Sequence, residues 1–170
     1  RAAGLGGIPI PLPGGDRRGA EAGAVVNAAN PQLTMDLGVA ASLLRHGGVE
    51  IESEVIALAP CAMGEVVWSS AGKLNAKFVA HAVAAIDGAI CIQRAVIRSL
   101  LGARRRGATS IAFPALGTGI GEVPHALGAK LMLEVIRTFS FIGSAGLNHV
   151  QVWLYDETAL HAWREVLEGM

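Results

Sequence analysis

The fold of this chain is limited first by a regular alternation of short apolar runs with segments whose apolar residues recur at helical spacing. The runs predict strands at residues 22–30, 77–83, 109–116 and 149–155, and the spaced segments predict helices after Gly38, at 86–101, at 127–139 and at 160–167. Strands that alternate with helices are typical of a parallel sheet covered by helices on both faces.

One segment departs from this alternation. The stretch GEVVWSSAGKLNAKFVAHAV, residues 64–83, contains two apolar runs joined by a short polar turn at residues 71–73. Such a turn predicts a hairpin, so part of the sheet is expected to be antiparallel. We therefore expect a three-layer α/β/α sandwich with a mixed, largely parallel central sheet. Residues 1–12 fit either an edge strand or a loose tail.

Size and charge set the limits on function. A chain of 170 residues suits one domain, here residues 1–170. Lys and Arg total 14, as do Asp and Glu, so an anionic partner must be bound by a local site. The two cysteines lack metal-ligand spacing, and we expect neither a metal nor a cofactor. Without an evident secretory leader or membrane span, a cytoplasmic location is expected, and abundant Ala, Gly and Arg favour a bacterial source.

The first candidate binding loop follows the strand predicted at residues 22–30, with the sequence NAANPQLTMDLG. In an open α/β sheet, ligands bind beyond the carboxyl ends of the strands, where Asn27 and Asn30 lie. A carboxamide can hold a sugar hydroxyl or steer a water molecule without adding charge. Alternatively, these side chains bond to their own backbone and shape the turn before Pro31. The local role suits Asn27 better, and the ligand role suits Asn30 better.

The second candidate loop has glycine at alternate positions, in the sequence GTGIG at residues 117–121. Glycine leaves backbone N–H groups uncovered beside the start of a helix, which favours an anion such as phosphate. The alternative is a plain tight turn. Because Glu122 stands where a dinucleotide-binding loop needs glycine, a dehydrogenase is disfavoured, and the Walker motif of nucleotide triphosphatases is absent.

Four segments together resemble the macro domain family, whose members bind ADP-ribose and in several branches hydrolyse its conjugates. They are GD at residues 15–16, VVNAAN at 25–30, SIAFPALGTGI at 110–120 and WLYD at 153–156. The resemblance covers nearly the whole chain. It implies a macro-like fold, with ADP-ribose or a derivative, free or linked to a protein, as the partner.

The resemblance also assigns roles at the adenine. It implies that the carboxylate of Asp16 accepts a hydrogen bond from the adenine amino group and that the N–H of Arg17 reaches a ring nitrogen. The ring of Tyr155 would stack on the base. On residue type alone, Asp16 would be a turn former and Tyr155 an aromatic at the edge of the core.

Two loops would hold the diphosphate through their backbone N–H groups. Hydrogen bonds to charged oxygens are strong enough to bind a diphosphate without any Lys or Arg. Asn30 would contact the distal ribose and is the candidate catalytic residue. The loops implied by the resemblance are formed by Gly38, Val39 and Ala40, and by Gly117, Thr118, Gly119, Ile120 and Gly121.

The chain departs from the hydrolytic members of the family at two places. Ala40 stands where many of them carry an aspartate, and Gly121 stands where many carry an aromatic residue. Asn30 has no basic lone pair and cannot act as a general base. We therefore expect a binding protein, and we leave open slow hydrolysis of an ADP-ribosyl ester or of ADP-ribose-1''-phosphate.

A different class of function remains open. Arg104, Arg105 and Arg106 could make the protein a nucleic-acid or poly(ADP-ribose) scaffold. Nucleic acid is the weaker interpretation, because no aromatic residue interleaves the arginines and because cations suit the end of a helix. Three further aromatic residues are expected in the core or at its edge rather than as stacking platforms. They are Trp68, Trp153 and Trp163.

Overall fold

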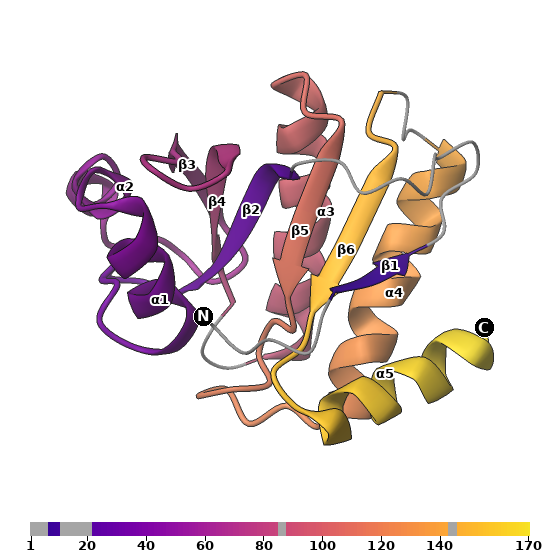
Figure 1. Ribbon diagram of the computed structural model, residues 1–170. Coiled ribbons are helices and arrows are strands. Elements are labelled where there is room, and N and C mark those ends of the chain that lie inside the picture. The colour runs from indigo at the N-terminus through magenta and orange to yellow at the C-terminus, as the bar shows by residue number, and fades with distance from the viewer. Residues whose placement is uncertain (1–6, 11–21, 85–87, 143–145) are drawn as a thin grey trace.

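A six-stranded sheet forms the centre of the computed structural model, which describes residues 7–10, 22–84, 88–142 and 146–170 (Figure 1). The strand order is β1-β6-β5-β2-β4-β3. The four inner strands are parallel, and the two edge strands are antiparallel to their neighbours, which confirms a mixed, largely parallel sheet. The strands are β1 (Gly7–Ile10), β2 (Ala22–Ala29), β3 (Val66–Ser70), β4 (Ala76–Val83), β5 (Ser110–Pro114) and β6 (His149–Trp153).

Both edges of the sheet match segments that the sequence singled out. β3 and β4 form the hairpin expected at residues 64–83, with Trp68 opposite Ala80. At the other edge β1 pairs with β6, with Ile8 opposite Val152, so part of residues 1–12 is an edge strand.

Helices lie on both faces of the sheet, which gives the expected three layers. α3 and α4 cover one face with α5 packed along α4, while α1 and α2 lie on the opposite side next to β2 and β3 (Figure 1). α2 and a 3-10 helix, η1, were not predicted because three or four residues are too short to show a helical period. The helices are α1 (Gly38–Gly47), α2 (Glu50–Ser53), η1 (Ile56–Leu58), α3 (Ala89–Arg105), α4 (His125–Ile142) and α5 (Glu157–Glu168).

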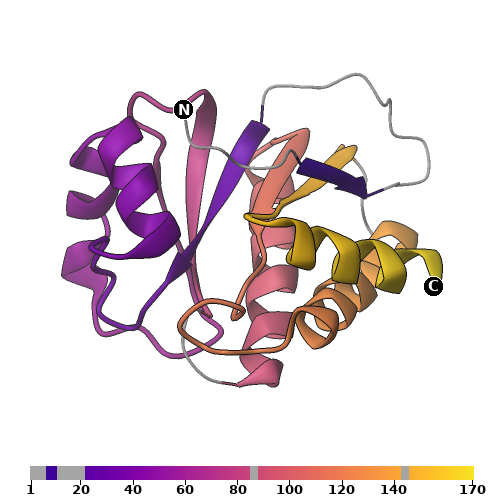
Figure 2. The same cartoon turned by 60° about the horizontal axis from the view of Figure 1, so that its bottom comes forward.

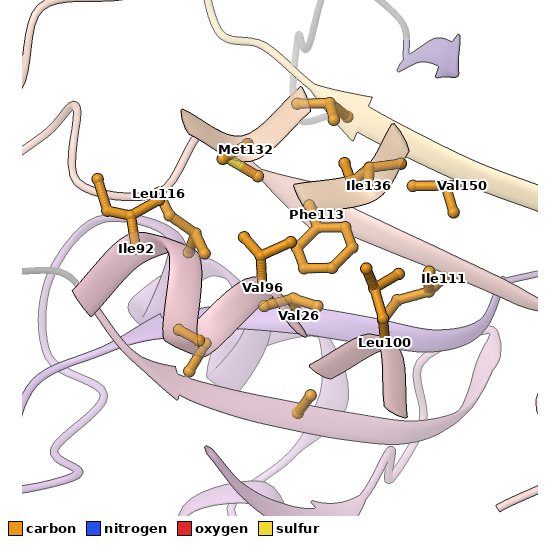
Figure 3. Close-up of a cluster of buried hydrophobic side chains, with 14 of the residues drawn as sticks. Val26, Ile92, Val96, Leu100, Ile111, Phe113, Leu116, Met132, Ile136 and Val150 are labelled. Carbon is orange, nitrogen blue, oxygen red and sulfur yellow. The ribbon is translucent and has the colours of Figure 1, made fainter. Parts of the chain in front are cut away.

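The main core fills the space between the sheet and the layer formed by α3 and α4. Phe113 of β5 is fully buried there and lies among side chains from both helices, including Val96, Leu100 and Ile136 (Figure 3). Ile92, Val96 and Leu100 recur every four residues, so they form one face of α3. This packing fixes the position of β5 and therefore the starting point of the loop that follows it.

A smaller core holds α1 against the opposite face. Ala40 of α1 is 5% exposed and packs in a cluster with Met35, Ile51 and Val79. Side chains alternate along β2, so Val26 enters the main core while Val25 and Asn27 face the side of α1. α1 lies beside β2, and none of the described helices covers this side of β5 and β6 (Figure 1). This part of the sheet provides the floor of the candidate site.

Candidate functional site

Two adjoining cavities lie between α1 and the ends of β5 and β6. The sheet cavity has a volume of about 370 Å³, and its lining includes Ala112, Pro114 and Trp153. The loop cavity has a volume of about 440 Å³, and its lining includes Gly38 and residues 117–120. Together they are large enough for a ligand of nucleotide size. The residues common to both cavities are Val39, Ser42, Pro114 and Tyr155.

The start of α1 borders the loop cavity with free backbone donors. Its first internal hydrogen bond runs from the Ala41 N–H to the Leu37 carbonyl over 3.3 Å. The N–H groups of Gly38, Val39 and Ala40 therefore have no acceptor within the described residues, and Leu37 provides no side-chain cap. The side chain of Ala40 packs in the small core, and the residue lines neither cavity. Such an uncapped helix start attracts anions.

The glycine loop borders the same cavity. Figure 2 shows this loop, in orange, where it leaves β5 and leads to α4. Gly117 has a φ of +77°, and a Cβ atom there would lie 2.7 Å from Cδ1 of Ile92, so glycine is required. The Val123 N–H donates to the Gly117 carbonyl and closes the loop. Within the described chain, the N–H groups of residues 118–120 donate to no protein acceptor. Two rows of free donors therefore flank the loop cavity.

Asn30 has a local partner in this structure. Its Nδ2 donates to the hydroxyl of Thr34 over 2.9 Å, and its Oδ1 accepts from the Thr34 N–H over 3.2 Å. The Thr34 hydroxyl in turn donates to the exposed carboxylate of Asp36. Asn30 is half-buried and is not among the described residues that line either cavity. This geometry corresponds to the turn-shaping alternative, and a ligand contact or catalytic role for Asn30 stays a prediction.

Aromatic side chains stand at the junction of the cavities and in the sheet cavity. Tyr155 borders both cavities and is 64% exposed, and partial burial raises the pKa of its phenol. Trp153 borders the sheet cavity and is 45% exposed, so its expected place in or beside the core was wrong. Because Val150 and Val152 are buried in the main core, the alternation along β6 turns Trp153 to the other face. That alternation is the signal that could have identified it.

Five of the predicted site residues are not among the described residues that line a cavity. Asp16 and Arg17 lie outside the described residues, so their roles stay predictions. Asn30, Ala40 and Gly121, the last residue of the glycine loop, are described but line neither cavity. Asp156, which also lines the loop cavity, caps α5 by accepting from the Ala159 N–H over 2.8 Å. The lining residues that were not predicted as site residues are Ala28, Leu37, Ser42, Pro114, Ala115, His125 and Asp156.

Asn27 belongs to a buried structural network, as its local interpretation predicts. Its Nδ2 lies 3.2 Å from Nδ1 of His81, and Nε2 of His81 lies 2.9 Å from the Ser69 hydroxyl. Burial lowers the pKa of His81 to about 4. The neutral ring accepts at Nδ1 and donates from Nε2 to Ser69, whose hydroxyl donates to the Ser70 carbonyl. These side chains stabilise β2, β3 and β4 and do not line either cavity.

Two of the three consecutive arginines lie over aromatic rings. The Arg106 guanidinium is 4.2 Å from the ring centroid of Trp68, and that of Arg104 is 5.8 Å from that of Phe139. A Cβ atom at Gly102 would lie 2.5 Å from Trp68, so this glycine lets the indole rest against α3. No aromatic residue lies among the arginines in the sequence, but the fold brings one ring from β3 and one from α4 against them. This cluster lies at the end of α3, away from the cavities.

The described residues contain neither a metal-ligand cluster nor a membrane-spanning helix. No group of three or more His, Cys, Asp or Glu side chains is arranged to hold a metal ion there. None of the helices in those residues has the length and apolar character needed to cross a membrane.

Comparison with known sequences identifies the family. Residues 26–132 match the family model described as Macro domain. An uncharacterized protein of Saccharolobus solfataricus is 36% identical over 171 residues, which cover 96% of this chain and 95% of the relative. An uncharacterized protein of Aquifex aeolicus is 36% identical over 152 residues, covering 86% of this chain and 90% of the relative. Relatives therefore occur in archaea and in bacteria.

Solved structures share the fold. A variant of the Oceanobacillus iheyensis macrodomain with ADPR is similar with a TM-score of 0.85 and 22% identity, covering 96% of this chain and 98% of that one. The Trypanosoma brucei macrodomain in complex with ADP-ribose is similar with a TM-score of 0.80 and 23% identity, covering 85% of this chain and 63% of that one. From the family match and the close relatives together, this chain belongs to the Macro domain family.

Proposed function

We propose that this protein binds ADP-ribose or ADP-ribosylated molecules across the two adjoining cavities. The observation that supports this most directly is the pair of free N–H rows, at Gly38–Ala40 and at residues 118–120, on either side of the loop cavity. A diphosphate placed between them would receive several hydrogen bonds to charged oxygens. Among the described lining residues there is no Lys or Arg, so the backbone supplies the recognition.

The sheet cavity suits the adenine and its ribose. Its lining is mostly apolar, and Trp153 and Tyr155 stand at its edge with exposed ring surface. Stacking on an aromatic side chain contributes about 1–3 kcal/mol per base. In this proposal Tyr155 stacks on the adenine, while Asp16 and the N–H of Arg17 bind its edge. The similar structures from O. iheyensis and T. brucei contain ADPR and ADP-ribose, respectively, which supports this ligand class.

Binding is the primary function in this proposal, and hydrolysis is secondary. Ala40 brings no carboxylate, and its side chain packs in the small core. Asn30 is already bonded to Thr34. One observation favours slow hydrolysis of an ADP-ribosyl ester or of ADP-ribose-1''-phosphate: Thr34 links Asn30 to the carboxylate of Asp36. Asp36 precedes Leu37, which lines the loop cavity.

Titration calorimetry with ADP-ribose tests the binding proposal, with AMP and NAD as comparison ligands. We expect a micromolar dissociation constant for ADP-ribose, weaker binding of AMP, and loss of affinity in Asp16→Ala. Absence of heat with ADP-ribose at protein concentrations above that range would overturn the proposal. A nucleic-acid or poly(ADP-ribose) scaffold would instead show affinity that falls steeply with salt and survives Asp16→Ala.

A further inference from the structure

His125 lies in the loop cavity, and its imidazole has no hydrogen-bond partner within the described residues. It is the first residue of α4, an 18-residue helix, and it lines the loop cavity. Its Nδ1 is buried and makes no hydrogen bond within the described chain. Its Nε2 is not among the buried unpaired atoms and has no protein hydrogen bond there either. The ring therefore has one nitrogen inside the protein and the other accessible.

Two other polar side chains that line the loop cavity are already engaged. The Thr118 hydroxyl donates to the Ala115 carbonyl over 3.0 Å, and the carboxylate of Asp156 accepts from the Ala159 N–H. Among the described lining residues, His125 carries the only side-chain nitrogen. An anion in the loop cavity therefore meets one side-chain N–H group besides the backbone donors.

The burial of Nδ1 determines which nitrogen donates in the neutral ring. A proton on Nδ1 would bury an N–H group without an acceptor, which folded proteins rarely tolerate. A proton on Nε2 places the donor on the accessible side and leaves only a lone pair inside. At the start of a helix an imidazole N–H is an effective donor to a negatively charged oxygen, because the positive end of the helix dipole also attracts that oxygen.

We propose that His125 donates its Nε2–H to a phosphate oxygen of the bound ligand. This inference rests on the ADP-ribose binding proposed above. It adds a side-chain contact to a site otherwise built from the start of α1 and the glycine loop.

The test compares three substitutions at one position by titration calorimetry with ADP-ribose. The amide nitrogen of His125→Gln can take the place of Nε2, whereas that of His125→Asn reaches only the place of Nδ1. We expect the dissociation constant to rise about 10- to 100-fold in His125→Ala and His125→Asn, which is typical of a lost hydrogen bond to a charged group. We expect His125→Gln to stay close to the wild type.

Leu127→Ala is the matched control, because Leu127 lies in the same turn of α4, is exposed, and does not line the loop cavity. It should bind as the wild type does, and all variants should keep the wild-type melting temperature. Unchanged affinity in His125→Ala, or equal losses in the Ala, Asn and Gln variants, would overturn the role of Nε2 while leaving ADP-ribose binding intact. No binding by the wild-type protein would instead overturn the proposed function, and this inference with it.

Discussion

The carboxamide of Asn30 and the hydroxyl of Thr34 are joined by a 2.9 Å hydrogen bond, and the Thr34 N–H bonds back to the same carboxamide. This reciprocal pair holds the loop that leads from β2 to α1. The free donors at the start of α1 therefore depend on a loop whose shape Asn30 helps to set. An effect of Asn30 on ligand affinity has to be separated from its effect on the loop.

A double-mutant cycle makes that separation. We expect Asn30→Ala and Thr34→Val each to lower the free energy of unfolding by about 1 kcal/mol, because each removes a hydrogen bond of the pair. The double variant should lose less than the sum of the two, with a coupling of about 0.5 kcal/mol or more in urea unfolding. Strict additivity would contradict a stabilising pair. An affinity loss in Asn30→Ala that Thr34→Val does not share would identify a direct ligand contact.

The buried His81 predicts a stability that depends on pH. Its pKa is lowered from 6.5 to about 4, so the unfolded chain binds the proton more tightly than the folded one. The contribution of His81 to the free energy of unfolding should therefore be complete above pH 6.5. It should fall as the pH drops toward 4, by up to about 3 kcal/mol. Urea unfolding between pH 7 and 4 measures this loss.

Two variants assign the pH dependence to His81. His81→Gln cannot titrate, so its unfolding free energy should fall less over the same pH range. His161→Gln removes an exposed histidine of α5 that lies 3.4 Å from Glu165, and it should keep the wild-type slope. Equal slopes in the wild type and His81→Gln would show that His81 is not the responsible group.

Tyr155 should contribute to affinity through its ring rather than its hydroxyl. Tyr155→Ala is expected to weaken ADP-ribose binding by a factor of about 5 to 150, the range that corresponds to one stacked base, while Tyr155→Phe should bind nearly as the wild type does. Phe141→Ala, an exposed aromatic at the far end of α4, is the control and should have no effect. If Tyr155→Phe loses as much affinity as Tyr155→Ala, the contact is made by the hydroxyl.

Substitutions at two glycines of the glycine loop should affect stability and ligand binding differently. Gly117→Ala is expected to destabilise the fold, because of its positive φ and the approach of its Cβ to Ile92. At Gly119 a Cβ would meet nothing within 4 Å, so Gly119→Val should keep the wild-type melting temperature. Its branched side chain should nevertheless obstruct a diphosphate in the loop cavity and weaken ADP-ribose binding at least tenfold. Wild-type affinity in Gly119→Val would place the diphosphate elsewhere.

The arginine cluster should matter for stability. Arg106→Ala is expected to lower the free energy of unfolding by about 1 kcal/mol, because it removes the contact with Trp68 and the hydrogen bond to the Gly102 carbonyl. Arg105→Ala, at an exposed neighbouring position, should be close to neutral. Thermal unfolding of both variants provides the comparison. Equal and negligible effects would leave the Arg106 side chain free for a role in binding.

Much of the fold was predictable because secondary structure follows from patterns between near neighbours. The alternation of apolar runs and helical spacing indicated the layers, and the polar turn at residues 71–73 indicated the β3–β4 hairpin. Helix ends were less accurate. The helix expected at 86–101 is observed at Ala89–Arg105, because the polar arginines of its last turn do not continue the apolar spacing from which the helix was predicted.

The site divides in the same way. By itself, the sequence determined where free backbone N–H groups occur, since glycines at 117 and 119 and a helix start after Leu37 act locally. Only the tertiary structure decided that Trp68 lies beneath Arg106 and that His125 reaches the loop cavity. These relationships join residues far apart in the chain, and they are set by how the helices pack on the sheet, which no local pattern specifies.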